Sequence, residues 1–428
     1  MTATDPPRND LPLADLHLTI AAVWKIESPR LIAGLMRMVR DVGLAEDLAQ
    51  DALVAALEQW PKSGVPDNPG AWLMTAAKRR AIDQFRRNSR LKGKHEELGR
   101  ELSAKELAMP DLDSALDDTV GDDLLRLLFV SCHPVLSKEA RVALTLRLLG
   151  GLTTDEIARA FLAPEPTIAQ RIVRAKRTLA EKRVPFEVPR GEELAERLSS
   201  VLAVVYLIFN EGYAATSGDD WMRPALCEEA LRLGRVLAEL APQEGEVHGL
   251  VALMEIQASR TNARVGPSGE PILLLDQNRA HWDQLLVRRG LAALDRAEKI
   301  GGARGPYRLQ AEIVACHVRA RTSEETDWAR IVKLYEELGR MAPSPIVELN
   351  RAVAVGMASG PAAGLQLVDS LVAQRSLEKY HLLPSVRGDF LKKLGRISEA
   401  KVEFERAAGL TSNARERELL LGRVRECG

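Results

Sequence analysis

The stretch LTTDEIARAFLAPEPTIAQRIVRAKRTL, residues 152–179, decides the fold in the middle of this chain. Thr153 and Glu156 have the spacing of a capping box, which predicts that a helix begins here and runs to about Phe161. Pro166 follows a short turn and suits the first turn of a second helix, where its missing N–H needs no partner. The pattern therefore predicts two helices joined by a tight turn.

The second of these helices has an apolar face and a polar face. Its apolar residues recur at steps of four, three and four and predict a buried stripe made of Ile168, Ile172, Ala175 and Leu179. The opposite face is able to reach phosphates and base edges in a major groove with Thr167, Gln170, Arg171, Arg174 and Arg177. This is typical of a DNA-binding helix-turn-helix, although a solvated basic face on an ordinary helical hairpin gives the same pattern.

The charge of the chain is distributed in blocks. The 428 residues suffice for two or three domains, and their formal net charge is -1. Residues 78–94 hold eight basic residues and one acid, whereas residues 96–123 hold ten acids and two basic residues. Any nucleic-acid surface must therefore be local. The four cysteines are far apart and form no CxxC pair, so we expect no disulfide framework, no metal site and no cofactor.

Nothing in the sequence suggests a membrane segment. Residues 1–9 are polar and contain no apolar signal core. The longest apolar run, residues 201–209, is less than half of the roughly 20 residues that a membrane span needs. We expect a cytoplasmic protein with no membrane partner.

Two amphipathic helices are predicted near the start of the chain, over residues 29–39 and 44–60. The second helix carries four acids and no basic residue, and we assign Val54 and Leu57 to its apolar side. A loop with three prolines follows over residues 61–69. The acidic face is either plain solvated surface or a docking surface for a basic helical partner.

The next predicted helix spans residues 70–87. It combines Trp72, Phe85 and a cluster of cations in its second half. Cations and aromatic rings together are the footprint of a protein that holds an opened nucleic-acid strand. A basic but merely solvated helix is the alternative.

In this order, the segments resemble the extracytoplasmic-function (ECF) sigma factors of RNA polymerase. Residues 45–60, AEDLAQDALVAALEQW, look like region 2.2, and residues 70–87, GAWLMTAAKRRAIDQFRR, look like regions 2.3 and 2.4. Residues 152–179 are similar to region 4.2, and residues 122–149 to the supporting region 4.1. The resemblance covers roughly residues 31–183. It implies an all-α fold, a non-enzymatic role in promoter recognition and opening, and core RNA polymerase and promoter DNA as partners.

The resemblance also implies roles for individual side chains, and none of them is catalytic. Docking on the clamp helices of the core polymerase is expected of Asp47, Gln50, Asp51 and Glu58. Contact with the -10 element is expected of Trp72, Lys78, Arg79, Arg80, Asp83, Arg86 and Arg87. Contact with the -35 element is expected of the five polar residues on the second helix of the helix-turn-helix.

Two departures from the family pattern matter. Family members usually carry Asn where Arg79 stands, so their base preference cannot be transferred to this chain. The usual Ser cap before the recognition helix is replaced by Pro164 and Glu165. The helix start must then depend on Pro166 and on an acid near the positive helix end.

The predicted organisation has four parts. Region 2 occupies residues 14–90, an acidic linker 91–120, region 4 residues 121–188, and a helical tail residues 189–428. The division suits the chemistry, because unpaired bases are held by cationic grooves with stacking side chains, whereas duplex DNA is recognised by a helix in the major groove. The linker is either a mimic of nucleic acid inside the polymerase or a disordered spacer.

The tail is helical in pattern throughout. An apolar helix is predicted over residues 198–209, with Gly212 as its stop. Beyond it, sets of small and apolar residues recur at steps of 41, 33 and 36 residues, with the middle members Leu294, Tyr335, Val368 and Phe404. These steps are close to the period of about 34 residues in tetratricopeptide (TPR) helix pairs, and Gly395 marks a turn in the last pair. Residues 262–277 are expected to interrupt the array as an exposed excursion.

A tail of this kind resembles one subgroup of the ECF sigma factors. Its members share stretches very like NEGYAAT, LLLDQNRAHWD, TDWARIVKLYEEL and PSPIVELNRAVAVG, which begin here at residues 210, 273, 326 and 343. The resemblance implies a TPR-like α-solenoid that takes the regulatory place of an anti-sigma factor. Its concave surface is expected to bind a protein or peptide partner. A scaffold without a ligand is the alternative.

Two polar clusters in the tail, residues 210–213 and 276–283, are open to two interpretations. They are ligand or latch contacts, or they are caps and buried hydrogen bonds in irregular turns, which we favour. No nucleophile–base order and no phosphate loop stands out, so we expect no enzyme activity.

Two other classes of protein compete with the sigma factor. One is a helix-turn-helix regulator that acts on duplex DNA alone, with the solenoid as its sensor. The other is a helical adaptor with incidental basic faces. The acidic helix over residues 45–60 favours the sigma factor, because a repressor has no use for a polymerase-docking helix.

Overall fold

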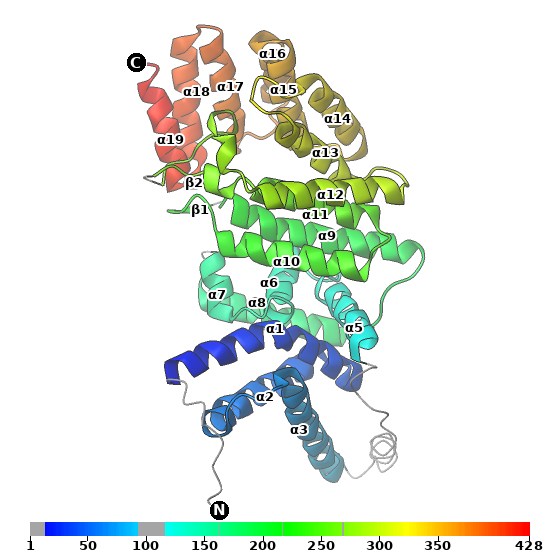
Figure 1. The fold of residues 1–428 in the computed structure, drawn as a ribbon. Coiled ribbons are helices and arrows are strands. Elements are labelled where there is room, and N and C mark those ends of the chain that lie inside the picture. Colours follow the sequence, from blue (N-terminus) through cyan, green and yellow to red (C-terminus); the bar gives the residue numbers. More distant parts are fainter. Residues whose placement is uncertain (1–12, 93–115, 162, 216, 268) are drawn as a thin grey trace, which may run out of the picture. The chain divides into compact units, whose positions relative to one another are not determined.

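A computed structural model describes residues 13–92 and 116–428, apart from residues 162, 216 and 268. Helices dominate this part of the chain (Figure 1), so the predicted all-α class is confirmed. Its regular strands form one short parallel pair, β1 (Ser217–Gly218) with β2 (Ser412–Asn413). The chain divides into two compact units, Met1–Val204 and Val205–Gly428.

Several helices of the first unit are longer than predicted, among them the first three. Its helices are α1 (Leu13–Val39), α2 (Val42–Ser63), α3 (Pro69–Lys92), α5 (Leu116–Ser131), α6 (Lys138–Leu148), α7 (Thr154–Ala160), α8 (Glu165–Glu181) and the first part of α9 (Glu192–Tyr213). Leu16 and Ile20 extend the buried stripe of α1 toward its N-terminus. Pro29 therefore lies inside the helix, where it removes one backbone hydrogen bond. Pro61 likewise lies inside α2, which shortens the predicted loop.

The helix-turn-helix of α7 and α8 forms as predicted. The Thr153 N–H donates to Glu156 Oε2 at 2.7 Å, and the Glu156 N–H donates to Thr153 Oγ1 at 3.1 Å. Helix α8 has no side-chain cap and begins after Pro164, with Pro166 in its first turn. Its predicted apolar stripe is buried, from Ile168 to Leu179. The local pattern was sufficient because each of these features involves residues within a few positions of one another.

Helix α9 continues past the predicted stop at Gly212. Gly212 is the penultimate residue of α9, and α10 (Pro224–Leu240) packs closely against it. A Cβ on Gly212 would lie 2.6 Å from the backbone nitrogen of Cys227. The absent side chain therefore permits a close approach of two helices, and the predicted helix end was wrong.

The other helices of the second unit pack in consecutive pairs, α11 with α12, α13 with α14, α15 with α16 and α17 with α18 (Figure 1). Their bounds are α11 (Gly245–Ala258), α12 (Gln284–Ile300), α13 (Pro306–Arg319), α14 (Trp328–Met341), α15 (Pro345–Ser359), α16 (Pro361–Ala373), α17 (Leu382–Lys393), α18 (Ile397–Leu410) and α19 (Ala414–Arg425). The predicted repeat sets fall on the second helix of each pair. Gly395 has a φ of 76° in the turn between α17 and α18, as its predicted role requires.

Residues 262–277 form a partly packed segment, so the expectation of an exposed excursion is correct only in part. The segment contains the 3₁₀ turns η1 (Thr261–Ala263) and η2 (Leu274–Asp276). Val265 and Pro271 form an antiparallel bridge between them. Arg264 and Gln277 are only 6% and 9% exposed. Charged and amide side chains inside a loop are not visible as a burial pattern in the sequence.

Candidate nucleic-acid interface

One face of α2 carries acids and apolar side chains side by side. Asp47, Asp51 and Glu58 are exposed, at steps that place them along one stripe of the helix. Val54 and Leu57, which we assigned to the apolar side of the helix, are 48% and 41% exposed, so that side is not buried at these two positions. The stripe therefore presents acidic and apolar side chains together on one face of α2.

Gln50, the fourth residue predicted on this face, lies half-buried. Its side-chain amide donates to Glu46 Oε1 at 2.9 Å. Glu46 itself is only 3% exposed, and its carboxylate forms ion pairs with Arg147 of α6 at 2.6 Å and with Lys176 of α8. A buried charge on α2 thus connects this helix with both α6 and α8.

Glu46 was not among the residues singled out in the sequence. The burial of Glu46 could have been predicted from the helical spacing, because Val42, Ala45 and Ala49 place residue 46 on the buried side of α2. Its two partners were not predictable, since they lie more than a hundred residues away in the chain. Burial alone raises the pKa of Glu46, but Lys176 and Arg147 lower it, and the pKa ends below its usual value.

Three of the predicted -10 residues on α3, Trp72, Arg79 and Arg80, line a cleft of about 490 Å³. Trp72 contacts the buried Trp60 edge to face, with ring centroids 5.4 Å apart. Trp72 is half-buried and Arg79 is exposed. The residues that line the cleft are Ala55, Gln59, Ala71, Trp72, Thr75, Ala76, Arg79 and Arg80. The cleft offers an aromatic ring and two cations to a ligand.

The predicted -10 residues differ from one another in their surroundings. Arg80 forms an ion pair with Asp51 of α2 at 3.2 Å, so the two predicted surfaces adjoin. Lys78 is half-buried, and burial together with the charge of Arg37 lowers its pKa. Asp83 and Arg86 are exposed. The side chain of Arg87 and most of the predicted acidic linker, residues 93–115, lie outside the described residues.

The predicted -35 residues share the exposed face of α8. Thr167, Gln170, Arg174 and Arg177 are exposed and Arg171 is half-buried. Arg177 forms a surface ion pair with Glu181 at 2.6 Å. Val173 is 63% exposed on the same helix and was missed, because it was not treated as part of a binding surface. The face thus presents polar, cationic and apolar groups together.

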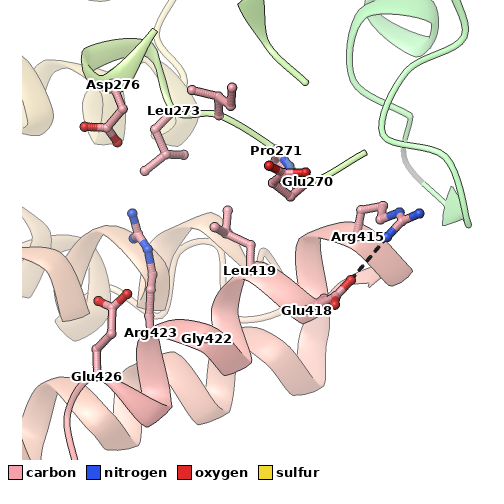
Figure 2. A pocket seen from close by; sticks show the side chains of 11 residues that line it. Glu270, Pro271, Leu273, Asp276, Arg415, Glu418, Leu419, Gly422, Arg423 and Glu426 are labelled. Atoms are coloured by element: carbon pink, nitrogen blue, oxygen red, sulfur yellow. Dashed lines mark hydrogen bonds and ion pairs between the residues drawn. The ribbon is translucent and has the colours of Figure 1, made fainter. Parts of the chain in front are cut away.

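The second unit has a pocket of about 500 Å³ between residues 270–276 and α19 (Figure 2). Leu273 and Leu419 face each other across it (Figure 2). Arg415 bonds to Glu418 at 3.4 Å within the pocket. Arg423 and Glu426 are paired with side chains outside it, Asp389 and Lys392, each at 2.7 Å. The charges around this pocket are therefore largely compensated.

The polar clusters of the tail contribute the caps and hydrogen bonds that we favoured. Asp283 accepts from the N–H groups of Leu285 and Leu286 at the start of α12. Arg279 donates to the backbone carbonyls of His317 and Ala320, each at 2.6 Å. Glu211 forms an ion pair with Arg223. These contacts order the irregular turns of the second unit.

In the described part of the chain, no helix meets the length and apolarity that a membrane crossing requires. Within the same residues, His, Cys, Asp and Glu side chains do not gather in a group suited to a metal ion. All four cysteines are free thiols. Burial raises the pKa of Cys132 to about 11 and that of Cys227 to about 12, so both stay protonated at neutral pH.

Comparison with known families places the two DNA-directed segments in one superfamily. Residues 25–91 match the family described as sigma-70 region 2, and residues 126–179 match sigma-70 region 4. Residues 197–298 match a family of unknown function (DUF6596). No solved structure matches the chain.

Related proteins cover the chain to different extents. An uncharacterised protein of Rhizobium meliloti (strain 1021) is 43% identical over 390 residues, which is 91% of each chain. The probable ECF RNA polymerase sigma factor SigI of Mycobacterium tuberculosis (strain ATCC 25618 / H37Rv) is 27% identical over 172 residues, 40% of this chain and 58% of that protein. The ECF RNA polymerase sigma factor SigK of Mycobacterium bovis (strain BCG / Pasteur 1173P2) is 30% identical over 157 residues, 35% of this chain and 78% of that protein.

Sigma regions 2 and 4 occur in this chain in the order that the motifs predicted, and relatives named as ECF sigma factors match it. Sigma factors of this family are non-catalytic, DNA-binding initiation factors. The chain belongs to the sigma-70 family and is an ECF sigma factor, a protein that binds RNA polymerase and acts in transcription initiation.

Proposed function

We propose that the exposed stripe of α2 docks on core RNA polymerase, that α3 holds the opened -10 strand, and that α8 recognises the -35 duplex. We further propose that the TPR-like tail regulates these steps. The observation that carries the proposal is the α2 stripe, where Asp47 and Asp51 lie beside the exposed apolar Val54 and Leu57. An acidic and apolar surface of this kind suits a basic helical partner.

The cleft beside Trp72 supports the assignment of the -10 contacts. A base that leaves the stack can lie against an aromatic ring, while Arg79 and Arg80 neutralise the adjoining phosphates. Because Arg80 also pairs with Asp51, strand binding and polymerase docking use adjoining surfaces of one unit. Single-strand binding is expected to weaken with salt, as for other cationic grooves.

The exposed face of α8 supports the assignment of the -35 contacts. Arg171 and Arg174 are suited to phosphates or guanine edges, and Gln170 to adenine. Val173, exposed between them, is suited to the methyl group of thymine. The rival function, a regulator of duplex DNA alone, would use this face without any need for the α2 stripe.

Polymerase docking is tested by reversing two charges, Asp47→Lys with Asp51→Lys. We expect the affinity for core polymerase to fall about a hundredfold or more, because like charges would meet across the interface. The matched control is Asp295→Lys with Glu298→Lys, which makes the same charge change on exposed positions of α12. Fluorescence anisotropy of the labelled full chain against core enzyme gives both affinities. Equal binding of both double variants would refute the docking surface.

Recognition of the -35 element is tested by Arg171→Ala with Arg174→Ala. We expect weaker binding to promoter duplex and a salt dependence that is shallower by about one unit per lost phosphate contact. Arg288→Ala with Arg296→Ala removes the same charge from exposed positions of α12 and serves as the control. An unchanged -35 footprint in the first variant would exclude these residues.

Regulation by the tail is tested by a truncated chain that keeps the whole of α9. Arg197 and Ser200 of α9 donate to the backbone carbonyls of Phe129 and Cys132, at 3.0 and 2.7 Å, so a chain cut before α9 would lose packing of the first unit. We therefore compare run-off transcription by the full chain and by a chain ending at Tyr213, after checking its helicity by circular dichroism. A change in initiation rate gives the sign of regulation. Equal rates would contradict a regulatory tail.

The tail is also proposed to bind a protein or peptide segment. The pocket of about 500 Å³ beside α19 supports this, because Leu273 and Leu419 offer apolar contact and the surrounding charges have both signs. Paired helices that stack in a row commonly present such binding surfaces.

A further inference from the structure

The second unit contains two buried arginines, Arg260 and Arg264, that form no ion pair with a carboxylate of the described residues. Arg260 follows α11, and Arg264 lies four residues later in the partly packed segment over residues 262–277. The two residues are 7% and 6% exposed. Arg279, in the 3₁₀ turn η3 (Arg279–His281), lies close enough to Arg260 for their charges to interact. We refer to Arg260, Arg264 and Arg279 as the arginine cluster.

Aromatic rings position the two most buried arginines. The guanidinium carbon of Arg264 lies 3.5 Å from the ring centroid of Tyr213 and 5.5 Å from that of Trp221. Arg260 lies 5.8 Å from the Tyr213 centroid. Stacking of this kind stabilises a cation, but by itself it does not satisfy all the N–H groups at the edge of the guanidinium.

Three buried donors in this group have no hydrogen-bond partner among the described residues. They are Arg260 Nε, Arg264 Nη1 and Trp221 Nε1. Buried donors are normally satisfied, so three together call for an explanation. Neither Arg260 nor Arg264 forms an ion pair with a described carboxylate, and Glu211, close in sequence to Tyr213, is paired with Arg223.

The arginines also make this region of the second unit positively charged. Burial and the charges of Arg260 and Arg279 lower the pKa of His317 to about 4. Burial also lowers the pKa of Arg264, and the neighbouring Arg260 adds to this effect. Burial lowers the pKa of Arg279, and the charges of Glu324 and Glu325 oppose this effect. An unpaired buried cation strongly destabilises a fold, so a fold that retains two of them is suited to receive an anion.

We propose that the arginine cluster is a binding site for a small oxyanion, a phosphate or carboxylate group that accepts hydrogen bonds from Arg260 and Arg264. Guanidinium groups match the oxygens of these anions in geometry and charge, and the indole N–H of Trp221 supplies a further donor. Apart from His317, the residues of the site lie within residues 197–298, the segment that matches a family of unknown function. The site does not depend on the docking or promoter contacts proposed above.

The test measures thermal unfolding of the full chain by circular dichroism at constant ionic strength. Chloride is replaced in separate titrations by inorganic phosphate, sulfate or acetate. We expect a saturable rise of the Tm, because a ligand that binds only the folded state stabilises it. A response to phosphate and sulfate but not to acetate assigns the site to phosphate groups, and a response to acetate assigns it to carboxylates.

The variant Arg264→Met separates a binding site from a structural arginine. We expect it to lose the saturable response and, in chloride, to unfold at the same or a higher temperature than the wild type, because a buried unpaired charge has been removed. The control Arg289→Met removes a cation that is paired with Glu255, which keeps Arg235 as a second partner, and should retain the response. Sulfate and phosphate also stabilise proteins by exclusion, but that effect does not saturate and would be equal in all variants.

The proposal is overturned if no anion gives a saturable rise in the wild type, or if Arg264→Met lowers the Tm equally in all four salts. If Arg264→Met does not fold, isothermal titration of phosphate or acetate into the wild type and into Arg260→Gln decides the question. A loss of affinity of about tenfold or more in Arg260→Gln supports the site, since charged hydrogen bonds of this kind are lost. Equal affinities, or no heat in either protein, refute it.

Discussion

Glu46 in the first unit and Arg264 in the second are both buried charged side chains, but their surroundings are opposite. Glu46 has two cationic partners, Arg147 and Lys176. Arg264 has aromatic rings and another cation, Arg260, as its neighbours. A buried charge with partners fastens helices together, whereas a buried charge without one is an unsatisfied site. The presence or absence of a partner thus distinguishes a structural charge from a candidate ligand site, without reference to sequence conservation.

The contrast is tested most strongly at Glu46. Glu46→Gln removes the carboxylate charge and leaves Arg147 and Lys176 without their shared partner. We expect the free energy of unfolding to fall by about 3 kcal/mol, the lower end for a broken buried pair, because both cations keep some exposure to water. Urea unfolding followed by circular dichroism measures it. Asp47→Asn, on the exposed side of the same helix, should change it by less than about 0.5 kcal/mol, and equal losses in both variants would contradict the buried role.

The two units are expected to lose stability in different pH ranges. His317 is held neutral when folded, with a pKa of about 4 against 6.5 for the free side chain, so the unfolded state takes up its proton first. Stability should therefore decline by about 2 to 3 kcal/mol as the pH falls from 6.5 to 4, and His317→Gln should abolish that slope.

Glu46 affects the stability of the protein in a lower pH range. Its folded pKa is depressed, so its contribution is complete above about 4.5 and is lost only as the pH falls through the folded value. Unfolding measured from pH 7 to 3 separates the two groups. If the free energy of unfolding of His317→Gln still declines between pH 6.5 and 4, the decline cannot be assigned to His317.

The next largest loss of stability is expected at Gly212, the neighbour of Tyr213 in α9. Gly212→Ala would place a Cβ 2.6 Å from the backbone nitrogen of Cys227 and displace the helix that carries Tyr213. We expect a loss of about 2 kcal/mol in the free energy of unfolding. Gly409→Ala is the control, since its Cβ would meet nothing within 4 Å in α18, and it should stabilise by up to about 1 kcal/mol. The same sign for both variants would contradict the packing explanation.

The smallest effect is expected for an exposed charge pair. Arg177 pairs with Glu181 on the surface of α8, where water screens the attraction. Arg177→Ala should leave the midpoint of urea unfolding unchanged within error while weakening duplex binding. A clear loss of stability would show that surface pairs matter more in this helix than the comparison with Glu46 assumes.

Local patterns predicted much of the fold and of the candidate interface. The capping box of Thr153 and Glu156, the buried stripe of α8 and the turn at Gly395 all involve residues within one or two helical turns. The same reasoning failed at Gly212, because only the neighbouring α10 explains that glycine. It also failed at Val54 and Leu57, which were assigned to the apolar side of the helix although they are exposed.

The sequence by itself determined the all-α class, the order of regions 2 and 4, and the polar face of α8. These follow from helical periodicity and from motifs that are contiguous in the chain. Only the tertiary structure decided which charges are buried and whether they have partners. Arg147 and Lys176 reach Glu46 from distant helices, and Tyr213 meets Arg260 and Arg264 from a separate segment of the chain. The physical reason is that the energy of a charge depends on its solvation and on its neighbours in space, and neither is encoded in local spacing.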